Sequence, residues 1–145
     1  DIMPLHWFKK FYLKNENIKL IYFSINYDGY FKFYPQHKLD NDVLILFNKD
    51  QQSKKDNKTR AVGPDCSEII QDYFSKTHKT YLFKSNWNDV RSKKFQLIFL
   101  DFCEKIIIKN KKTNFLEWLH FRKEKIINKK SNLQVSNNDF LAIKV

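Results

Sequence analysis

The segment IKLIYFSINYDGYFKFY, residues 18–34, carries the strongest local structural signal in the chain. β-Branched and aromatic residues dominate it on both sides of Asp28-Gly29, and this composition is typical of β-strands. An Asp-Gly pair between two such runs favours a two-residue type I′ turn. The sequence therefore predicts a β-hairpin with its turn at Asp28-Gly29, in which Tyr27 pairs with Tyr30.

The residues around this hairpin predict a small N-terminal unit that spans residues 1–50. Residues 4–14 carry apolar side chains at helical spacing and predict a short amphipathic helix. Residues 42–47, DVLILF, form a short apolar run that favours a buried third strand. The polar segment 51–64 that follows predicts an exposed basic loop or linker.

The second half of the chain, residues 65–145, is dominated by helical patterns. It begins with Asp65 and Glu68, which have the spacing of a helix-capping pair. The patterns then predict a helix, a short strand, two further helices and a terminal hairpin with an Asn-rich turn. The expected ranges are 65–76, 80–83, 88–108, 114–130 and 133–145.

This order of elements is that of a winged helix, a helix-turn-helix variant that carries a β-hairpin wing. The likeness lies in the element order and in no residue motif. We therefore expect an α+β fold with a winged-helix-like C-terminal half, 65–145, a linker at 51–64, and an N-terminal helix and hairpin at 1–50.

The 88–108 helix is expected to bury one face and to expose an ion pair between Asp101 and Lys105. A strand over 95–100 is the alternative, because short apolar runs fit both periods. The face expected to be buried comprises Phe95, Phe99, Phe102 and Ile106. In the 114–130 helix the apolar stripe comprises Phe115, Trp118, Leu119 and Ile126.

The composition indicates a basic globular protein. Hydrophobic residues make up 42% of the chain, which is too many for a disordered tail, and the formal net charge is +11. Such a charge points to a polyanionic partner such as DNA or RNA. A competing explanation is an AT-rich genome, which raises Lys over Arg and would account for part of the charge without any function.

The excess of positive charge is concentrated toward the C-terminus. Residues 106–145 hold nine Lys and Arg residues against three acids. In a winged helix the third helix enters the major groove, and here that helix and the turn before it carry the cations. The candidate nucleic-acid-binding residues are Lys109, Lys111, Lys112, Arg122, Lys123, Lys125, Lys129 and Lys130. The alternative is a solvated helix face with no partner.

No residue pattern typical of catalysis or of a metal site occurs. Cys66 and Cys103 form no zinc spacing with the four histidines, and Asp40 and Asp42 are the nearest approach to a nuclease metal pair. We therefore expect no cofactor, metal, membrane span or small-molecule substrate. The sequence favours a non-enzymatic, nuclear or cytoplasmic nucleic-acid-binding domain within a larger assembly. The alternatives are a protein–protein interaction domain of a replication, transcription or telomere complex and, more remotely, a metal-dependent nuclease or toxin.

Overall fold

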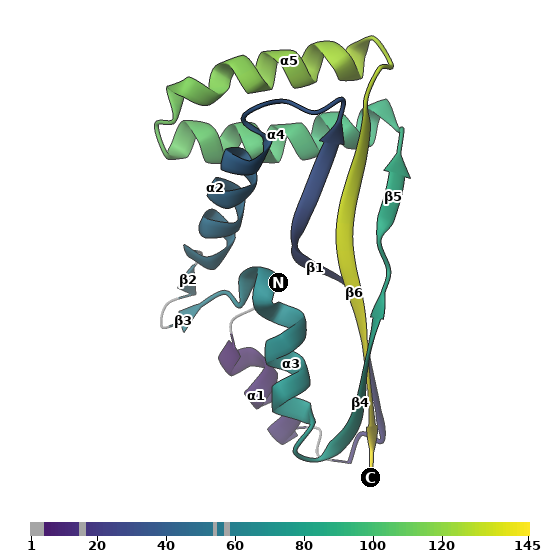
Figure 1. The fold of residues 1–145 in the computed structure, drawn as a ribbon. Helices are drawn as coiled ribbons and strands as arrows, with labels where there is room; N and C mark the ends of the chain where they lie inside the picture. Colours follow the sequence, from purple (N-terminus) through teal and green to yellow (C-terminus); the bar gives the residue numbers. More distant parts are fainter. Residues whose placement is uncertain (1–4, 15–16, 54, 57–58) are drawn as a thin grey trace. The chain divides into compact units, whose positions relative to one another are not determined.

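The computed structural model describes residues 5–14, 17–53, 55–56 and 59–145, and it confirms the expected α+β class (Figure 1). The helices are α1 (Leu5–Lys14), α2 (Asp40–Ser53), α3 (Cys66–Phe74), α4 (Lys93–Lys109) and α5 (Leu116–Ile127). The strands are β1 (Leu20–Tyr34), β2 (Lys55–Asp56), β3 (Thr59–Arg60), β4 (His78–Lys84), β5 (Trp87–Val90) and β6 (Asn132–Lys144). Two short 3-10 helices, Gly63–Asp65 and Thr113–Phe115, precede α3 and α5.

The chain divides into two compact units, each built from segments that are distant in sequence. The first unit comprises Asp1–Gly29, Gln51–Asn86 and Ser136–Val145, and the second comprises Tyr30–Asp50 and Trp87–Val135. Both β1 and β6 pass from one unit into the other, so the division falls within strands and not in a polar linker. The sequence predicted a sequential division at 51–64 instead.

In the first unit, two helices pack on a sheet of strand order β1-β6-β4. β4 and β6 are antiparallel, and their register runs from His78 opposite Lys144 to Lys84 opposite Asn138. Apolar residues of α1 and α3 meet the inner face of β6 in one buried cluster. This cluster includes Phe8, Ile70, Phe74, Phe140 and Ala142.

In the second unit, α2, α4 and α5 bury an aromatic core together with the strands. Trp118 and Leu133 are completely buried, and the ring of Phe33 lies 6.0 Å from that of Trp118. Phe99 of α4 contacts Phe31 and Phe47, with ring centroids 4.9 and 5.8 Å away. β5 pairs with β6 through Trp87 opposite Val135.

The hairpin predicted at Asp28-Gly29 is wrong, because residues 20–34 form the single strand β1. A type I′ turn needs positive φ at both central residues, and of these two only Gly29 has one, at 90°. Asp28 instead makes long-range contacts: its Oδ2 accepts hydrogen bonds from Lys84 Nζ at 2.6 Å and Ser136 Oγ at 2.9 Å. Pairing with distant β6 therefore overrides the local turn signal.

The predicted C-terminal hairpin is also wrong, and with it the wing of the winged helix. Residues 132–144 form one strand, β6, which pairs with both β4 and β5. The Asn-rich stretch has no glycine to take the positive φ of a tight turn, and Asn137 is buried within the strand.

The third strand predicted at 42–47 is helical instead. α2 carries Asp40 and Asp42 in its first turn, where acidic residues favour helix N-termini, and it buries Val43 and Phe47 on one side. The segment 51–64 is only partly a loop, since α2 continues to Ser53 and Val62 is buried.

The helices expected at 65–76, 88–108 and 114–130 are present as α3, α4 and α5, with shifted bounds. The capping pair of α3 is wrong, because Asp65 makes no capping bond and accepts a hydrogen bond from Gln52 at 3.1 Å. α4 begins after Ser92, whose hydroxyl accepts a hydrogen bond from Phe95 N at 3.3 Å.

The buried face of α4 is rotated from the one predicted. Ile106 is buried and Asp101 pairs with Lys105 at 2.7 Å, as expected, but Phe102 is exposed. Apolar residues surround much of α4, so their spacing alone does not select one face. The residues buried along α4 are Gln96, Leu100, Cys103, Ile106 and Ile107.

Candidate functional site

The predicted cationic residues lie in two separate groups within the second unit. Lys109 ends α4, and Lys111 and Lys112 lie in the turn before α5. Lys129 and Lys130 follow the other end of α5. The twelve residues of α5 span about 18 Å at 1.5 Å per residue. The length of α5 therefore separates the two groups, and Lys123 lies exposed between them.

Arg122 does not belong to any exposed surface, and its assignment as a nucleic-acid contact is wrong. Its side chain is 0% exposed and donates hydrogen bonds to the Pro35 carbonyl oxygen and to Asp40 Oδ1. Arg122 lies four residues from both Trp118 and Ile126, so it shares the buried face of α5. Burial lowers the pKa of Arg122, and the hydrogen bond to Asp40 opposes that effect.

Two further candidates are already engaged by neighbouring groups. Lys109 Nζ donates to Asp50 Oδ1 at 2.6 Å, and the Asp50 side chain is almost completely buried. Lys125 pairs with Glu124 at 3.0 Å and lies over the ring of Phe121, 5.0 Å from its centroid. Both lysines are therefore less available to an external anion than their neighbours.

Lysines occupy the left-handed position that closes both α4 and α5. Lys111 and Lys129 have φ values of 53° and 55°, a conformation that glycine adopts most easily. In each case the residue after the left-handed lysine donates a backbone hydrogen bond to the last turn of the helix. These bonds run from Lys112 N to Ile107 O at 3.0 Å and from Lys130 N to Lys125 O at 2.9 Å. The two helix ends are thus matched in sequence and geometry.

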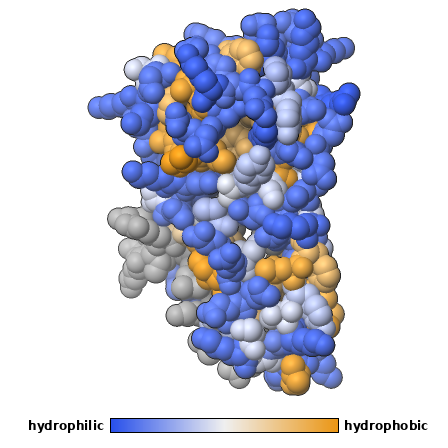
Figure 2. All heavy atoms as spheres, in the orientation of Figure 1, coloured by the Kyte–Doolittle hydropathy of each residue, from blue (hydrophilic) through white to orange (hydrophobic). Residues whose placement is uncertain are grey.

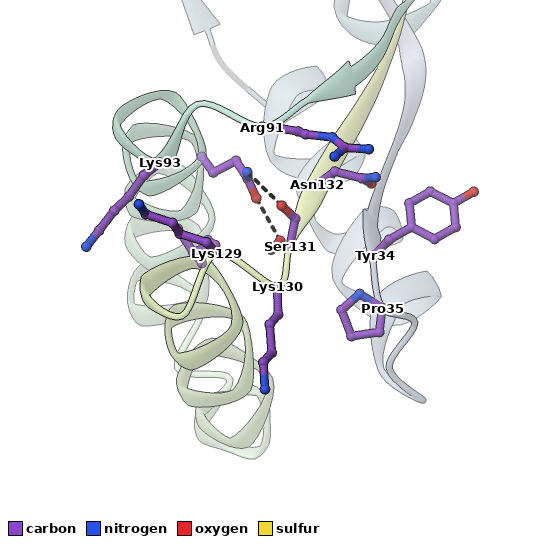
Figure 3. A pocket seen from close by; sticks show the side chains of 10 residues that line it. Tyr34, Pro35, Arg91, Lys93, Lys129, Lys130, Ser131 and Asn132 are labelled. Atoms are coloured by element: carbon purple, nitrogen blue, oxygen red, sulfur yellow. Dashed lines mark hydrogen bonds between the residues drawn. The ribbon is translucent and has the colours of Figure 1, made fainter.

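A hollow of about 730 Å³ lies in the second unit, beside the end of α5 (Figure 3). Its rim is formed by the ends of β1 and α5 and by the starts of α4 and β6. The lining residues include four cations and no carboxylate: they are Tyr34, Pro35, Arg91, Lys93, Gln96, Ile126, Lys129, Lys130, Ser131 and Asn132.

The wall of the hollow is fixed by a pair of hydrogen bonds between α4 and the start of β6. Gln96 is buried and donates from Nε2 to Ser131 O at 3.2 Å, while Ser131 Oγ donates to Gln96 Oε1 at 2.7 Å (Figure 3). Beside them, Asn132 Oδ1 is buried and has no hydrogen-bond partner in the described part of the chain. Sequence analysis missed Gln96 and Asn132; the signal for Gln96 was a polar residue at helical spacing from Leu100.

The charge of the second unit makes the hollow a positive region. This unit, all of which the structure describes, contains fifteen Lys and Arg residues and eight Asp and Glu residues. Among the residues that the structure describes, no carboxylate lies within 4.0 Å of the ammonium groups of Lys93, Lys129 and Lys130. Arg91 pairs with Asp89 at 2.8 Å, and this hydrogen bond raises the Arg91 pKa.

The nuclease alternative receives no geometric support from the described residues. Asp40 accepts hydrogen bonds from Trp118 Nε1 at 2.7 Å and His37 N at 2.8 Å besides pairing with Arg122. The described ranges contain no group of three His, Cys, Asp or Glu side chains that could hold a metal. Among the described helices, none is long and apolar enough to cross a bilayer.

The hollow therefore combines cations from several elements with an aromatic ring and an unpartnered acceptor. Lysine and arginine side chains bind phosphate through charge-assisted hydrogen bonds. The cations can bind the charged groups of an anion, while the aromatic ring and the Asn132 acceptor can contact a flat or polar group next to them. No protein-family model, no curated protein and no solved structure matches this chain.

Proposed function

We propose that this chain is a non-enzymatic nucleic-acid-associated domain that binds phosphates at the hollow of its second unit and acts within a larger assembly. The observation that carries the proposal is the set of Lys93, Lys129 and Lys130, which line one cavity and have no acidic partner within the described ranges. Phosphate contacts supply most of the affinity in nucleic-acid binding. Such a domain would act in the nucleus or the cytoplasm.

The proposal differs from the contact geometry of a winged helix. In that fold the face of the third helix enters the major groove. Here the corresponding helix, α5, directs Trp118, Arg122 and Ile126 into the core. The proposed contact therefore lies at the end of α5, where Lys129 and Lys130 leave the helix. The only part of the winged-helix-like expectation that this proposal keeps is that cations at the third helix of the C-terminal half, α5, bind nucleic acid.

A pair of charge-reversed variants tests where the phosphates bind. The test variant is Lys129→Glu/Lys130→Glu, and the control is Lys111→Glu/Lys112→Glu. The two pairs occupy the same backbone positions after α5 and α4, so charge change and local strain are matched. Affinity for fluorescent oligonucleotides, single-stranded and duplex, is measured by anisotropy at low salt, and folding is checked by circular dichroism.

We expect the Lys129→Glu/Lys130→Glu variant to lose at least tenfold in affinity, while the control loses less than about threefold. Equal losses in both variants would mean that charge acts non-specifically, and the hollow would not be the site. Absence of binding by the wild-type chain to every oligonucleotide at low salt would reject the proposed function.

A second candidate function, protein–protein interaction, is favoured by a different surface. Figure 2 shows apolar residues among polar ones on the face of the molecule that it displays. On the sheet of the first unit, the face opposite the buried cluster exposes several apolar side chains. They are Leu20, Tyr22, Phe83 and Ile143. If this candidate is right, a protein identified by mass spectrometry co-purifies with the wild type, is lost from Phe83→Lys, and is retained by Lys129→Glu/Lys130→Glu.

A further inference from the structure

We infer that the hollow accepts one unpaired nucleotide of a single strand, with its phosphates on the lysines and its base against Tyr34. This inference rests on the proposed function and adds the class of nucleic acid. Three observations carry it: the exposed ring of Tyr34, the unpartnered acceptor of Asn132, and the size of the cavity.

Tyr34 provides an aromatic surface at the rim of the hollow. Its side chain is 37% exposed although the residue ends a long strand. Lys32 Nζ lies over one face of the ring, 4.9 Å from the ring centroid, so the inference places the base against the other face. Proteins that bind single strands combine such rings with positive grooves.

The position of Tyr34 is fixed by the core. The next residue, Pro35, accepts a hydrogen bond from the buried guanidinium of Arg122. The rim that carries the ring is therefore anchored to α5, the helix that Lys129 and Lys130 follow. A preformed aromatic rim lowers the entropy that binding would cost.

Asn132 provides the feature that distinguishes an unpaired base from a base pair. Its Oδ1 is buried without a donor, and such an acceptor gains stability when a ligand supplies one. Every unpaired base has an N–H donor on its Watson–Crick edge, whereas in a duplex these donors are occupied by pairing. Figure 3 shows the Asn132 amide directed toward the side of the hollow where Tyr34 and Pro35 stand.

The dimensions and charges of the hollow suit a nucleotide. Its volume, about 730 Å³, lies within the range of ligand pockets, roughly 300–1,000 Å³. Lys129 and Lys93 lie on the side away from Tyr34 in Figure 3, so phosphates and base would occupy different parts of the cavity.

The test compares a twelve-nucleotide single strand of mixed sequence with the duplex of the same sequence, by anisotropy, on the intact chain. The variants are Tyr34→Leu, which removes the ring, Tyr34→Phe, which keeps it, and Asn132→Ala. Tyr30→Leu is the matched control, because Tyr30 lies in the same strand with a similarly exposed ring, 45%, and is not in the lining. Urea unfolding of each variant verifies that it is folded.

We expect the wild type to bind the single strand more tightly than the duplex. Tyr34→Leu should weaken single-strand binding at least about fivefold, the lower range for loss of one stacked base. Asn132→Ala should also weaken it, while Tyr34→Phe and Tyr30→Leu should retain it. Duplex affinity should not change in any of them.

Two results would overturn the inference, and they differ from failure of the proposed function. Unchanged single-strand affinity in Tyr34→Leu, together with loss in Lys129→Glu/Lys130→Glu, would leave phosphate binding without a base site. Equal affinity of the wild type for single strand and duplex would likewise exclude recognition of an unpaired base. Absence of all binding would reject both proposals together.

Discussion

Replacing Arg122 with methionine tests the most consequential difference between the expected and the observed role of a residue. If Arg122 were an exposed phosphate contact, its loss would change stability by less than about 1 kcal/mol. The structure instead buries its side chain completely, with the guanidinium carbon 5.3 and 5.6 Å from the ring centroids of Phe33 and Trp118. Breaking a buried ion pair typically costs about 3–5 kcal/mol.

The cost should depend on which partner is removed. After Arg122→Met, Asp40 remains 23% exposed and keeps the donors Trp118 Nε1 and His37 N, so we expect the lower value, about 3 kcal/mol. After Asp40→Ala, the fully buried guanidinium of Arg122 loses its counter-ion and keeps only the Pro35 carbonyl oxygen, and the indole N–H of Trp118 loses its acceptor. We expect about 5 kcal/mol or more for this variant. Asp40→Asn, which keeps an oxygen acceptor, should fall between the two.

Urea unfolding followed by tryptophan fluorescence measures these differences through the transition midpoint at a constant slope. Lys123→Met, on the exposed side of the same helix, is the control and should change stability by less than about 0.5 kcal/mol. A cost below about 1 kcal/mol for Arg122→Met, or a smaller cost for Asp40→Ala than for Arg122→Met, would refute the reasoning.

Three further predictions concern stability and reactivity. Lys111→Gly and Lys129→Gly should each raise the free energy of unfolding by about 0.5–1 kcal/mol in urea titrations, because glycine adopts the positive φ of both positions without strain; destabilisation would contradict the helix-end geometry. Leu100→Ala should lower the free energy of unfolding by about 2–5 kcal/mol and Phe102→Ala by about 1 kcal/mol or less. A larger loss for Phe102→Ala in thermal melts would show that α4 buries the face predicted from sequence. Burial raises the pKa of Cys66 and Cys103, which lowers the thiolate fraction at any given pH; a thiol reagent at pH 8 should therefore label neither residue in native protein and both in urea, and rapid native labelling would argue against their burial.

The sequence was sufficient to predict helices whose apolar residues recur on one face. α5 is the clearest case, since Phe115, Trp118, Leu119 and Ile126 are all buried as expected. α4 was located but its face was not, because Ile98 and Phe102 are apolar and exposed while Gln96 is polar and buried.

Strand pairing could not be predicted from local signals. The Asp28-Gly29 and Asn-rich segments resemble turns, yet both lie within long strands that pair with partners far away in sequence. Turn propensity is a local preference of modest size, and pairing over many residues outweighs it. α2 was the opposite error, since its acidic first turn, Asp40 and Asp42, is a helical signal of which the apolar window 42–47 contained only the second residue.

The candidate site was predictable only in part, for a similar reason. Lys129 and Lys130 were identified from charge concentration along the chain. Arg91 and Tyr34 come from two other segments and join them only through the fold, whereas Asn132 lies two residues after Lys130 and was missed because it carries no charge. A list of cations also cannot distinguish Arg122 from its neighbours unless its position on the buried stripe of α5 is considered.

The most direct test of phosphate binding at the hollow is the salt dependence of oligonucleotide affinity. For a single strand, the slope of log affinity against log salt concentration changes by about 0.7 for each phosphate contact. Lys129→Glu/Lys130→Glu should therefore reduce the magnitude of the wild-type slope by about 1.4, while Lys111→Glu/Lys112→Glu should leave it nearly unchanged. A slope that is the same in the wild type and in Lys129→Glu/Lys130→Glu would contradict the account.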